Sequence, residues 1–399
     1  MEHSRQLTAQ LPLKLYESFM LHDESPAYPM TFALELRLSG QLDRDAFQEA
    51  CEDAVRLHPL LTTRVEKSRW RYANWVPSDL PPPVDWSCAN DGHPPRPGPI
   101  DITAEPGLRI WVRDDPLEPR IWLQFHHVAT DGIGAMQFVG DLLARYGVRT
   151  ASDGQRRPEP APVSIERLHE REILWPEPQY RDRLLSTSLR RLWSLSVDRP
   201  KPLAARRSDL ADATSGDPPE PGVFPPFHTR ILDSQTLHGL KSSASRRMIT
   251  LNDFTTLAVF RALRAWNREQ GQLDPDACLR LSLPLNLRLP LHDDSPASNH
   301  LSLMLLSRVQ GALDDTDEVL RYIHRATEIC AGGIEGRLFT YWAGGLASRV
   351  PWLFRLGGGR GCFCTAILAN IGRVRRHVRG RFPLDAGRIV AGSVRLEAL

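Results

Sequence analysis

The first and last thirds of this sequence alternate strand-like and helix-like stretches, and a proline-rich middle separates them. Residues 32–38 alternate apolar and polar side chains, which is typical of a strand. Asp43 can cap the following helix, in which apolar residues recur at helical spacing until the chain reaches His58-Pro59. Alternation on both sides of a connection predicts an α/β fold of mixed sheets in two lobes. The other expected strands are 108–113, 120–128, 227–232, 278–287, 301–309 and 361–371, and the other expected helices are 132–146, 250–268 and 317–331.

Composition divides the chain into three parts. Residues 150–163 and 199–226 are crowded with Pro, Ser, Asp and Gly, which is typical of loops and linkers. Between them, residues 164–197 contain two helical stretches rich in Arg and Leu. We therefore expect an N-terminal lobe at 1–160, a helical and proline-rich connection at 161–225, and a C-terminal lobe at 226–399.

Charge and cysteine content limit the possible partners and the cellular compartment. The 50 basic and 48 acidic residues nearly cancel, so no global field favours nucleic acid or a membrane surface. The apolar runs are too short to span a bilayer, and the N-terminus lacks the apolar core of a signal peptide. The six cysteines have no metal-site spacing. We expect a cytoplasmic protein with reduced thiols, no transmembrane segment and no nucleic-acid partner.

One segment, FHHVATDG at residues 125–132, carries the chemistry. Imidazole can take up a proton and return it near neutral pH, so either histidine could act as a base. On a strand, His126 and His127 point to opposite sides, so only one of them faces a given cleft and a shared metal site is not expected. Asp131 suits a structural role, in an ion pair with a basic residue, and Gly132 permits a tight backbone at the helix start.

HHVATDG resembles the HHxxxDG signature of condensation domains, chloramphenicol acetyltransferases, wax ester synthases and related acyltransferases. Residues 38–65 are similar to the first strand, the following helix and the RHPxLRT segment of that superfamily. LRLSLPLNLR at 279–288 resembles the PVNLR strand of wax ester synthase-like members, Ser298-Asn299 their following GN, and residues 361–372 the later SNxG strand. The resemblance covers roughly residues 10–375 in outline.

This resemblance implies two chloramphenicol acetyltransferase-like lobes with a channel between them. It places His126, His127, Asp131 and Gly132 in the catalytic motif and makes His127, the second histidine, the general base. His127 would deprotonate an acceptor hydroxyl or amine during attack on a thioester and then protonate the departing thiolate, whereas His126 would pack or orient. The implied co-substrate is acyl-CoA or a phosphopantetheine thioester on an acyl or peptidyl carrier protein, with no bound cofactor and no metal.

Two departures from the family pattern produce further expectations. Thr62 stands where condensation domains carry the arginine that pairs with the motif aspartate. We therefore expect Arg288, with Arg64 as the alternative, to pair with Asp131, and Asn286 to form hydrogen bonds at the strand end. The chain also stops soon after Gly372, where typical relatives continue, so an abbreviated second lobe is expected.

A run of arginines forms the one dense charge patch of the sequence. A solvated loop is the ordinary interpretation of such a run. The functional interpretation is that it binds the donor, through the phosphates of coenzyme A or an acidic carrier protein. The run comprises Arg373, Arg375, Arg376, Arg379 and Arg381.

The sequence thus favours an acyltransferase that moves an acyl group from a thioester to an alcohol or amine, with a preference for O-acyl transfer. Two alternatives remain open at this point. One is a free-standing condensation domain that forms amide bonds. The other is a degenerate, non-catalytic domain that binds a carrier protein or an acyl ligand.

Overall fold

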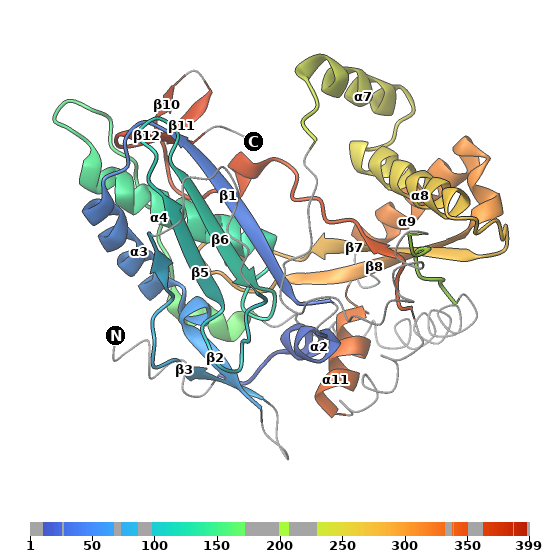
Figure 1. Cartoon of the computed structure of the whole chain (residues 1–399), viewed down its shortest axis with the longest axis horizontal. Helices are drawn as coiled ribbons and strands as arrows, with labels where there is room; N and C mark the ends of the chain where they lie inside the picture. Colours follow the sequence, from blue (N-terminus) through green and yellow to red (C-terminus); the bar gives the residue numbers. More distant parts are fainter. Residues whose placement is uncertain are drawn as a thin grey trace.

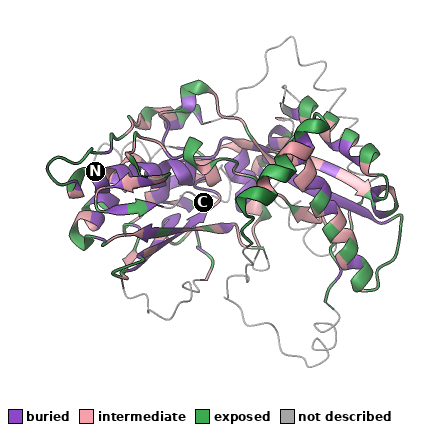
Figure 2. Ribbon diagram, turned by 90° about the horizontal axis from the view of Figure 1, so that it is seen from above, coloured by how far each residue is buried: buried purple, intermediate pink, exposed green. Residues whose placement is uncertain are grey.

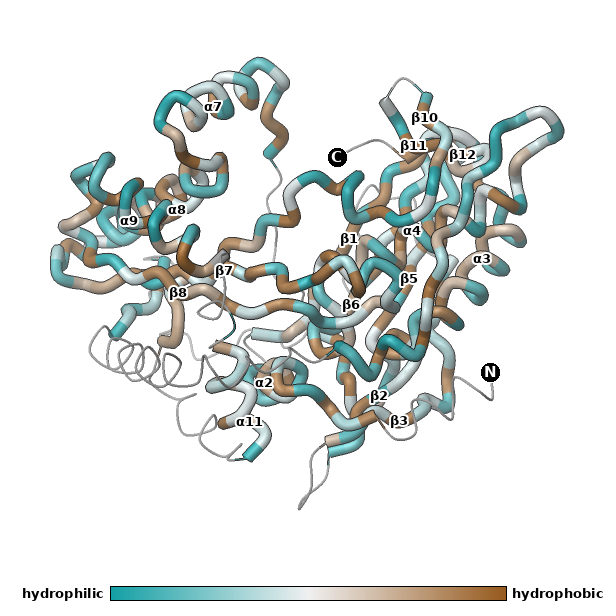
Figure 3. Tube along the Cα trace, turned by 180° about the vertical axis from the view of Figure 1, so that it is seen from behind, coloured by the Kyte–Doolittle hydropathy of each residue, from teal (hydrophilic) through white to brown (hydrophobic). Residues whose placement is uncertain are grey.

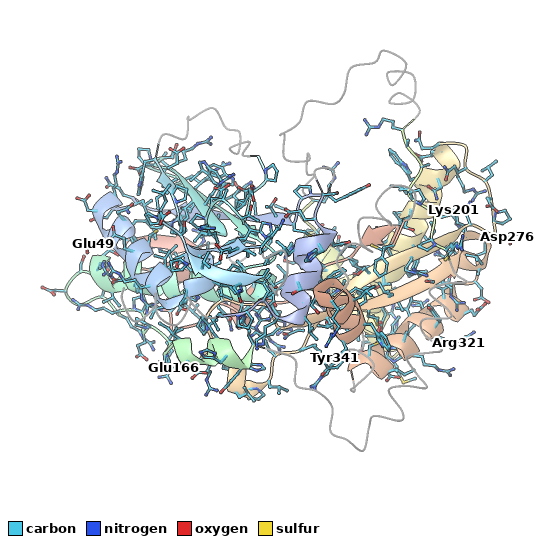
Figure 4. All side chains as sticks on the ribbon, turned by 90° about the horizontal axis from the view of Figure 1, so that it is seen from below. Glu49, Glu166, Lys201, Asp276, Arg321 and Tyr341 are labelled. Carbon is cyan, nitrogen blue, oxygen red and sulfur yellow. The ribbon has the colours of Figure 1, made fainter. Side chains whose placement is uncertain are left out.

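The computed structural model describes residues 11–25, 28–67, 73–86, 98–171, 199–206, 230–331, 337, 339–349, 362–385 and 387–396. A seven-stranded sheet and a three-stranded sheet, each with its own helices, form two halves that lie side by side (Figure 1). Seen from below, Glu49 lies on the first half, Asp276 and Arg321 lie on the second, and Tyr341 lies between them (Figure 4). The arrangement agrees with the two mixed α/β lobes expected from the sequence.

The larger sheet has the strand order β10-β11-β12-β1-β6-β5-β4. β1 lies near its centre and pairs antiparallel with β6, so that Thr31 stands opposite His126. This register places the end of β6, which carries the histidine motif, beside the beginning of β1. The strands are β1 Thr31–Ser39, β4 Val84–Asp85, β5 Leu108–Arg113, β6 Arg120–His126, β10 Leu384–Asp385, β11 Arg388–Ala391 and β12 Val394–Leu396.

The last strands of the chain complete the first sheet rather than the second. β12 pairs antiparallel with β1, with Leu396 opposite Leu38. The turn after β1 needs a glycine, because Gly40 has a φ of +107° and a Cβ there would lie 2.3 Å from the carbonyl oxygen of Ser393. The range 226–399 assigned to the C-terminal lobe therefore includes a segment, from β10 to β12, that belongs to the N-terminal sheet.

Helices α3 (Arg44–Leu57) and α4 (Gly132–Thr150) lie side by side against one face of this sheet (Figure 1). Asp43 caps α3 by accepting a hydrogen bond from the backbone N–H of Ala46, and α3 ends just before Pro59, as the sequence predicts. The buried residues follow the strands and the sheet-facing sides of the helices (Figure 2). A short turn and hairpin follow α3, namely η1 Pro59–Thr62, β2 Thr63–Glu66 and β3 Asn74–Pro77.

The smaller sheet has the order β8-β7-β9 and is mostly apolar (Figure 3). Its helix α8 begins with a capping box, in which Thr250 and Asp253 exchange side chain-to-backbone hydrogen bonds, as the sequence predicts. A separate cluster of buried residues from α8, α9, β7 and β8 forms the core of this lobe. The elements are α7 Ser234–Arg246, α8 Leu251–Glu269, β7 Cys278–Asn286, β8 Leu301–Val309, α9 Thr316–Ala331 and β9 Ala366–Ile367.

Short helices connect the two lobes. α2 (Leu15–Asp23) carries the buried Glu17, which accepts hydrogen bonds from the Arg171 guanidinium and from the Trp75 indole N–H. α2 also approaches the π-helical turn η7 so closely that a Cβ on Gly344 would lie 2.3 Å from the Leu15 carbonyl oxygen. The remaining short elements are η2 Ile165–Glu170, η5 Pro290–His292, η6 Gln310–Leu313, η7 Thr340–Gly344, α11 Gly345–Arg349 and η8 Val374–Arg376.

Two expected strands differ from the prediction in the described residues. Of the strand expected at 227–232, residues 227–229 lie outside the described ranges, and residues 230–232 are not a strand, because Ile231 and Leu232 are exposed and have no described strand to pair with. Within 362–371, only β9 is a strand, since its parallel pairing with β7 spans two residues before the chain turns towards Gly372, whose φ is +73°. Most of the helical stretch expected at 164–197 lies outside the described residues, apart from η2. No helix in the described ranges has the length and apolar character needed to cross a membrane.

Candidate active site

The histidine motif lies where β6 meets α4. β6 ends at His126, two residues earlier than the expected strand 120–128, because the backbone N–H groups of Ala129 and Thr130 donate to the carbonyl of His126. His127 donates its own backbone N–H to the carbonyl of Met30, just before β1. The two histidines therefore sit on either side of a strand end, and His127 occupies the turn.

His126 is fully buried and holds the motif in place. Its Nδ1 accepts a hydrogen bond from the backbone N–H of Val128, so the ring proton resides on Nε2. Nε2 then donates to the Glu24 carboxylate at 3.2 Å, and Glu24 is the residue that ends α2. Both ring nitrogens are thus used by the protein itself, which supports the expected orienting role of His126.

His127 is the partly exposed histidine of the pair. Its ring packs on Phe32 with 4.4 Å between ring centroids, and its Nδ1 is buried beside the backbone of Thr130. Burial and the neighbouring His126 lower the pKa of His127 to about 4, although the charge of Asp131 acts in the opposite direction. The imidazole is therefore neutral at physiological pH and able to accept a proton.

Asp131 is buried, and its carboxylate accepts four hydrogen bonds from described residues. Its Oδ1 caps α4 by accepting from the backbone N–H of Gly134, and its Oδ2 accepts from the backbone N–H of His300. Arg288 donates to both oxygens at 2.8 Å. Burial alone would raise the pKa of Asp131, but the Arg288 guanidinium and these hydrogen bonds outweigh it and hold the pKa below its ordinary value.

The ion pair expected between Arg288 and Asp131 is thus present, and Arg64 is not its source. Arg288 is itself held by the segment that follows β7, because it also donates to the carbonyl of Ser298. Asn286 lies at the strand end and accepts a hydrogen bond from the backbone N–H of Arg288. The Thr62 hydroxyl donates to the nearby carbonyl of Pro59, and among the described residues it is Arg288, not the position of Thr62, that supplies the positive charge beside Asp131.

Asn299 and His300 complete the site and were not assigned a role from the sequence. The side-chain amide of Asn299 donates to the carbonyls of both His127 and Val128, at 2.8 and 2.9 Å. Asn299 therefore fixes the turn that presents His127, and it comes from the opposite lobe. The resemblance of Ser298-Asn299 to a family GN pair was the only sequence signal for this contact.

The glycine that the site requires is Gly134 rather than Gly132. A Cβ on Gly132 would make ordinary contact with Ile371, at 3.4 Å, so the expected tight backbone is not found there. A Cβ on Gly134 would lie 2.3 Å from the Thr130 hydroxyl and 2.9 Å from the Ser298 carbonyl oxygen. The close approach between the lobes thus occurs at the second glycine of the helix.

A second buried cluster, which we call the His58 cluster, consists of His58, Asp141 and Arg379. His58 accepts a hydrogen bond from the backbone N–H of Ala297 at Nδ1 and contacts the Asp141 carboxylate through Nε2 at 3.1 Å. Arg379 donates to Asp141 at 2.9 Å and to the carbonyls of Asp293 and Ser295. The cluster ties α4 to the segment that carries Asn299 and His300.

This cluster corrects one expectation about the arginine run. Arg379 is largely buried, and its two terminal nitrogens donate to Asp141 and to backbone carbonyls, so these nitrogens are not available to bind an acyl donor. Arg373, Arg375 and Arg376 are exposed, and Arg381 forms an exposed pair with Glu159 at 3.4 Å. The run therefore divides into one buried structural residue and four surface residues. Within the described ranges, no group of His, Cys, Asp and Glu side chains is arranged to hold a metal ion.

Sequence comparisons give partial matches to transferases and synthetases. No family model matches the chain. Over 148 residues it is 27% identical to a phthiocerol/phthiodiolone dimycocerosyl transferase of Mycobacterium tuberculosis, which corresponds to 35% of this chain and 35% of that relative. Over 218 residues it is 29% identical to a probable nonribosomal peptide synthetase of Salinispora arenicola, covering 50% of this chain and 3% of the synthetase. The matched part of this chain therefore spans about a third of the length of the dimycocerosyl transferase and 3% of the length of the synthetase.

Structural comparisons cover nearly the whole chain. SgcC5 from Streptomyces globisporus superposes with a TM-score of 0.60 at 16% identity, over 97% of this chain and 84% of that one. The first condensation domain of the CDA synthetase gives a TM-score of 0.58 at 14% identity, over the same shares. Polyketide synthase associated protein 5 from Mycobacterium tuberculosis gives 0.53 at 18% identity, over 91% and 81%. The architecture of this chain is therefore the one that these proteins share.

Proposed function

Since this chain has the two-lobed fold of the condensation-domain and chloramphenicol acetyltransferase superfamily, we propose that it transfers an acyl group from a thioester to an alcohol or amine. The observation that carries the proposal is the anchored turn around His127. Asp131, Arg288 and Asn299 fix this turn from both lobes, and the imidazole that it presents is neutral and partly exposed. A positioned, neutral imidazole is what a general base requires.

In the proposed reaction, the nitrogen of His127 that is not buried, Nε2, takes the proton of the acceptor hydroxyl or amine. The acceptor oxygen or nitrogen forms a bond to the thioester carbonyl carbon, and the bond from that carbon to sulfur breaks. The imidazolium then gives its proton to the departing thiolate, so His127 ends neutral. The negative charge of Asp131 favours the imidazolium in between, because it acts to raise the pKa of His127.

We propose acyl-CoA or a phosphopantetheine thioester as the donor, with an acyl or peptidyl carrier protein as the partner in the second case. The relatives by sequence include a dimycocerosyl transferase and a nonribosomal peptide synthetase, which supports acyl transfer in general. We favour an alcohol acceptor over an amine, because LPLNLR at 283–288 resembles the corresponding strand of wax ester synthase-like proteins.

A thiol-release assay tests the proposal. The full chain would be incubated with acyl-CoAs of several lengths, or with acylated carrier protein, together with simple alcohols and amines. Release of free thiol that depends on both the acceptor and His127 is the expected result. If no donor and acceptor pair gives release above the His127→Ala background, the chain is a non-catalytic binding domain. Product formation only with amines would favour amide condensation.

A further inference from the structure

The phenyl ring of Phe32 packs directly on the imidazole of His127. The ring centroids are 4.4 Å apart and the ring planes are tilted by 30°, so the imidazole lies against the face of the phenyl ring. Phe32 is the second residue of β1, and His127 donates its backbone N–H to the carbonyl of Met30, just before that strand. The start of β1 therefore contacts His127 twice, once through the backbone and once through a ring.

Two further aromatic rings hold Phe32 in place. Phe125 stands opposite Phe32 in the pairing of β1 with β6, and the two rings are stacked with 5.3 Å between centroids and 20° between planes. Phe125 is fully buried and makes an edge contact with Phe138 of α4 at 6.1 Å. A ring packed against such neighbours cannot turn away without opening the core. The imidazole of His127 therefore lies on a fixed aromatic surface.

The positive charge that His127 acquires during acyl transfer is poorly stabilised by the groups around it. Burial, and after it His126, lower the pKa of His127 to about 4, so the site disfavours the imidazolium. Asp131 acts in the opposite direction, but Arg288 binds both of its carboxylate oxygens at 2.8 Å and offsets their charge. The face of an aromatic ring attracts a cation that lies within about 6 Å of the ring centroid. The ring of Phe32 meets this condition.

We propose that Phe32 is a positioning residue for acyl transfer, whose ring fixes the plane of the His127 imidazole and stabilises the imidazolium that forms when His127 takes the proton of the acceptor. The neutral imidazole gains packing from the ring, whereas the charged form gains a further electrostatic attraction. Because this attraction arises only after proton transfer, it raises kcat and leaves substrate binding unchanged. The kinetic consequence rests on the proposed function, whereas the effect of the ring on the charge of His127 does not.

A series of fluorinated phenylalanines in place of Phe32 tests the electrostatic effect of the ring in the full chain. Mono-, di- and trifluorophenylalanine nearly keep the size of the ring, so the site stays closed to water, while fluorine withdraws electron density from the ring face. In the thiol-release assay, kcat should fall with each added fluorine, by about three- to tenfold over the series, and the KM of donor and acceptor should stay unchanged. The same analogues in place of Phe382 are the matched control, since Phe382 is also partly buried against the core of the first lobe.

An NMR measurement without substrates distinguishes this inference from the proposed function. With a pKa of about 4, about one tenth of His127 is charged at pH 5, and the shift of its Cε1–H signal between pH 7 and pH 5 follows that fraction. The signal is assigned by its absence in His127→Ala. Trifluorophenylalanine in place of Phe32 should reduce the shift about three- to tenfold, and the same analogue in place of Phe382 should leave it unchanged.

An equal shift in both substituted proteins, or a kcat that does not depend on the number of fluorines on the ring of residue 32, would overturn the role of Phe32. A reduced shift without thiol release from any donor would instead overturn the proposed function and leave the effect of the ring on His127 standing.

Discussion

Arg288 donates a hydrogen bond of 2.8 Å to each carboxylate oxygen of Asp131, and the two residues come from different lobes. Both side chains are almost fully buried, so the pair is a two-point contact shielded from water. The same carboxylate caps α4 and binds the backbone of His300. The pair therefore fixes the start of the motif helix relative to the segment that follows β7.

We expect Asp131→Asn and Arg288→Gln each to lower the free energy of unfolding by about 3–5 kcal/mol, because each leaves a buried charge without its partner. The double variant should lose clearly less than the sum of the two. Urea denaturation of the four proteins measures this coupling. Full additivity would show that the pair does not act as a unit.

His127→Ala should lower turnover by about two to four orders of magnitude, which is the usual contribution of a general base, and should leave the fold intact. His126→Ala is the informative comparison. It removes the contacts to Val128 and Glu24, so its effect should include a lower melting temperature. Near wild-type turnover in His127→Ala, measured with the true substrates, would rule out the proposed mechanism.

Stability should fall as the pH drops from 7 to 5. Burial and His126 lower the pKa of His127 to about 4, and burial, Arg288 and His292 lower the pKa of His300 to about 3. In the unfolded chain both groups return to about 6.5. At pH 5 these two histidines alone bind about two more protons in the unfolded state than in the folded state, so acid favours unfolding across this window.

The melting temperature and the urea midpoint, followed between pH 7 and pH 5, measure this effect. The His300→Gln variant should show a shallower dependence on pH, because it removes one of the protons taken up on unfolding. A stability that does not change over this range would mean that these histidines already titrate normally in the folded protein.

Arg379→Ala and Arg381→Ala should differ sharply, although both residues belong to the arginine run. Arg379→Ala leaves Asp141 buried without its guanidinium and should cost about 3–5 kcal/mol. Arg381 is 83% exposed and 3.4 Å from Glu159, so its removal should cost less than about 1 kcal/mol. Urea denaturation distinguishes the two. A change in donor KM without loss of stability in Arg379→Ala would return this residue to donor binding.

Gly134→Ala should destabilise the protein by about 1–3 kcal/mol, because its Cβ would collide with Thr130 and Ser298. Gly132→Ala should be tolerated, since its Cβ meets only Ile371 at 3.4 Å, and alanine favours a helix over glycine. Thermal unfolding of the two variants is the measurement. The opposite order would place the close approach at Gly132 after all.

Local signals in the sequence predicted most of the fold well. Asp43 and Thr250 cap the helices that they were expected to cap, and the apolar runs at 278–287 and 301–309 form β7 and β8. The failures occurred where burial depends on distant partners. Residues 230–232 have a strand-like composition but no strand beside them, and residues 362–371 find β7 for only two residues.

The candidate site was predictable to the extent that it follows a local motif. HHVATDG located both histidines and Asp131, and the missing arginine at Thr62 directed attention to Arg288. The role of Asn299 was not predicted and that of Arg379 was predicted wrongly as donor binding, because each donates to backbone carbonyls that lie far away in the sequence. Hydrogen bonds from a side chain to distant backbone carbonyls depend on tertiary packing, and they produce no periodic pattern in the sequence.

Because β12 pairs with β1, the sheet of the first lobe can be completed only after the last residues of the chain have been synthesised. Leu38 emerges from the ribosome hundreds of residues before its partner Leu396, and α4 also emerges more than two hundred residues before Ala391, which packs against Gly147. Until then the nascent lobe exposes a sheet edge and a helix face that are prone to wrong contacts. A fragment that ends at residue 160 would keep that open edge permanently, and a separate peptide of 371–396 could close it.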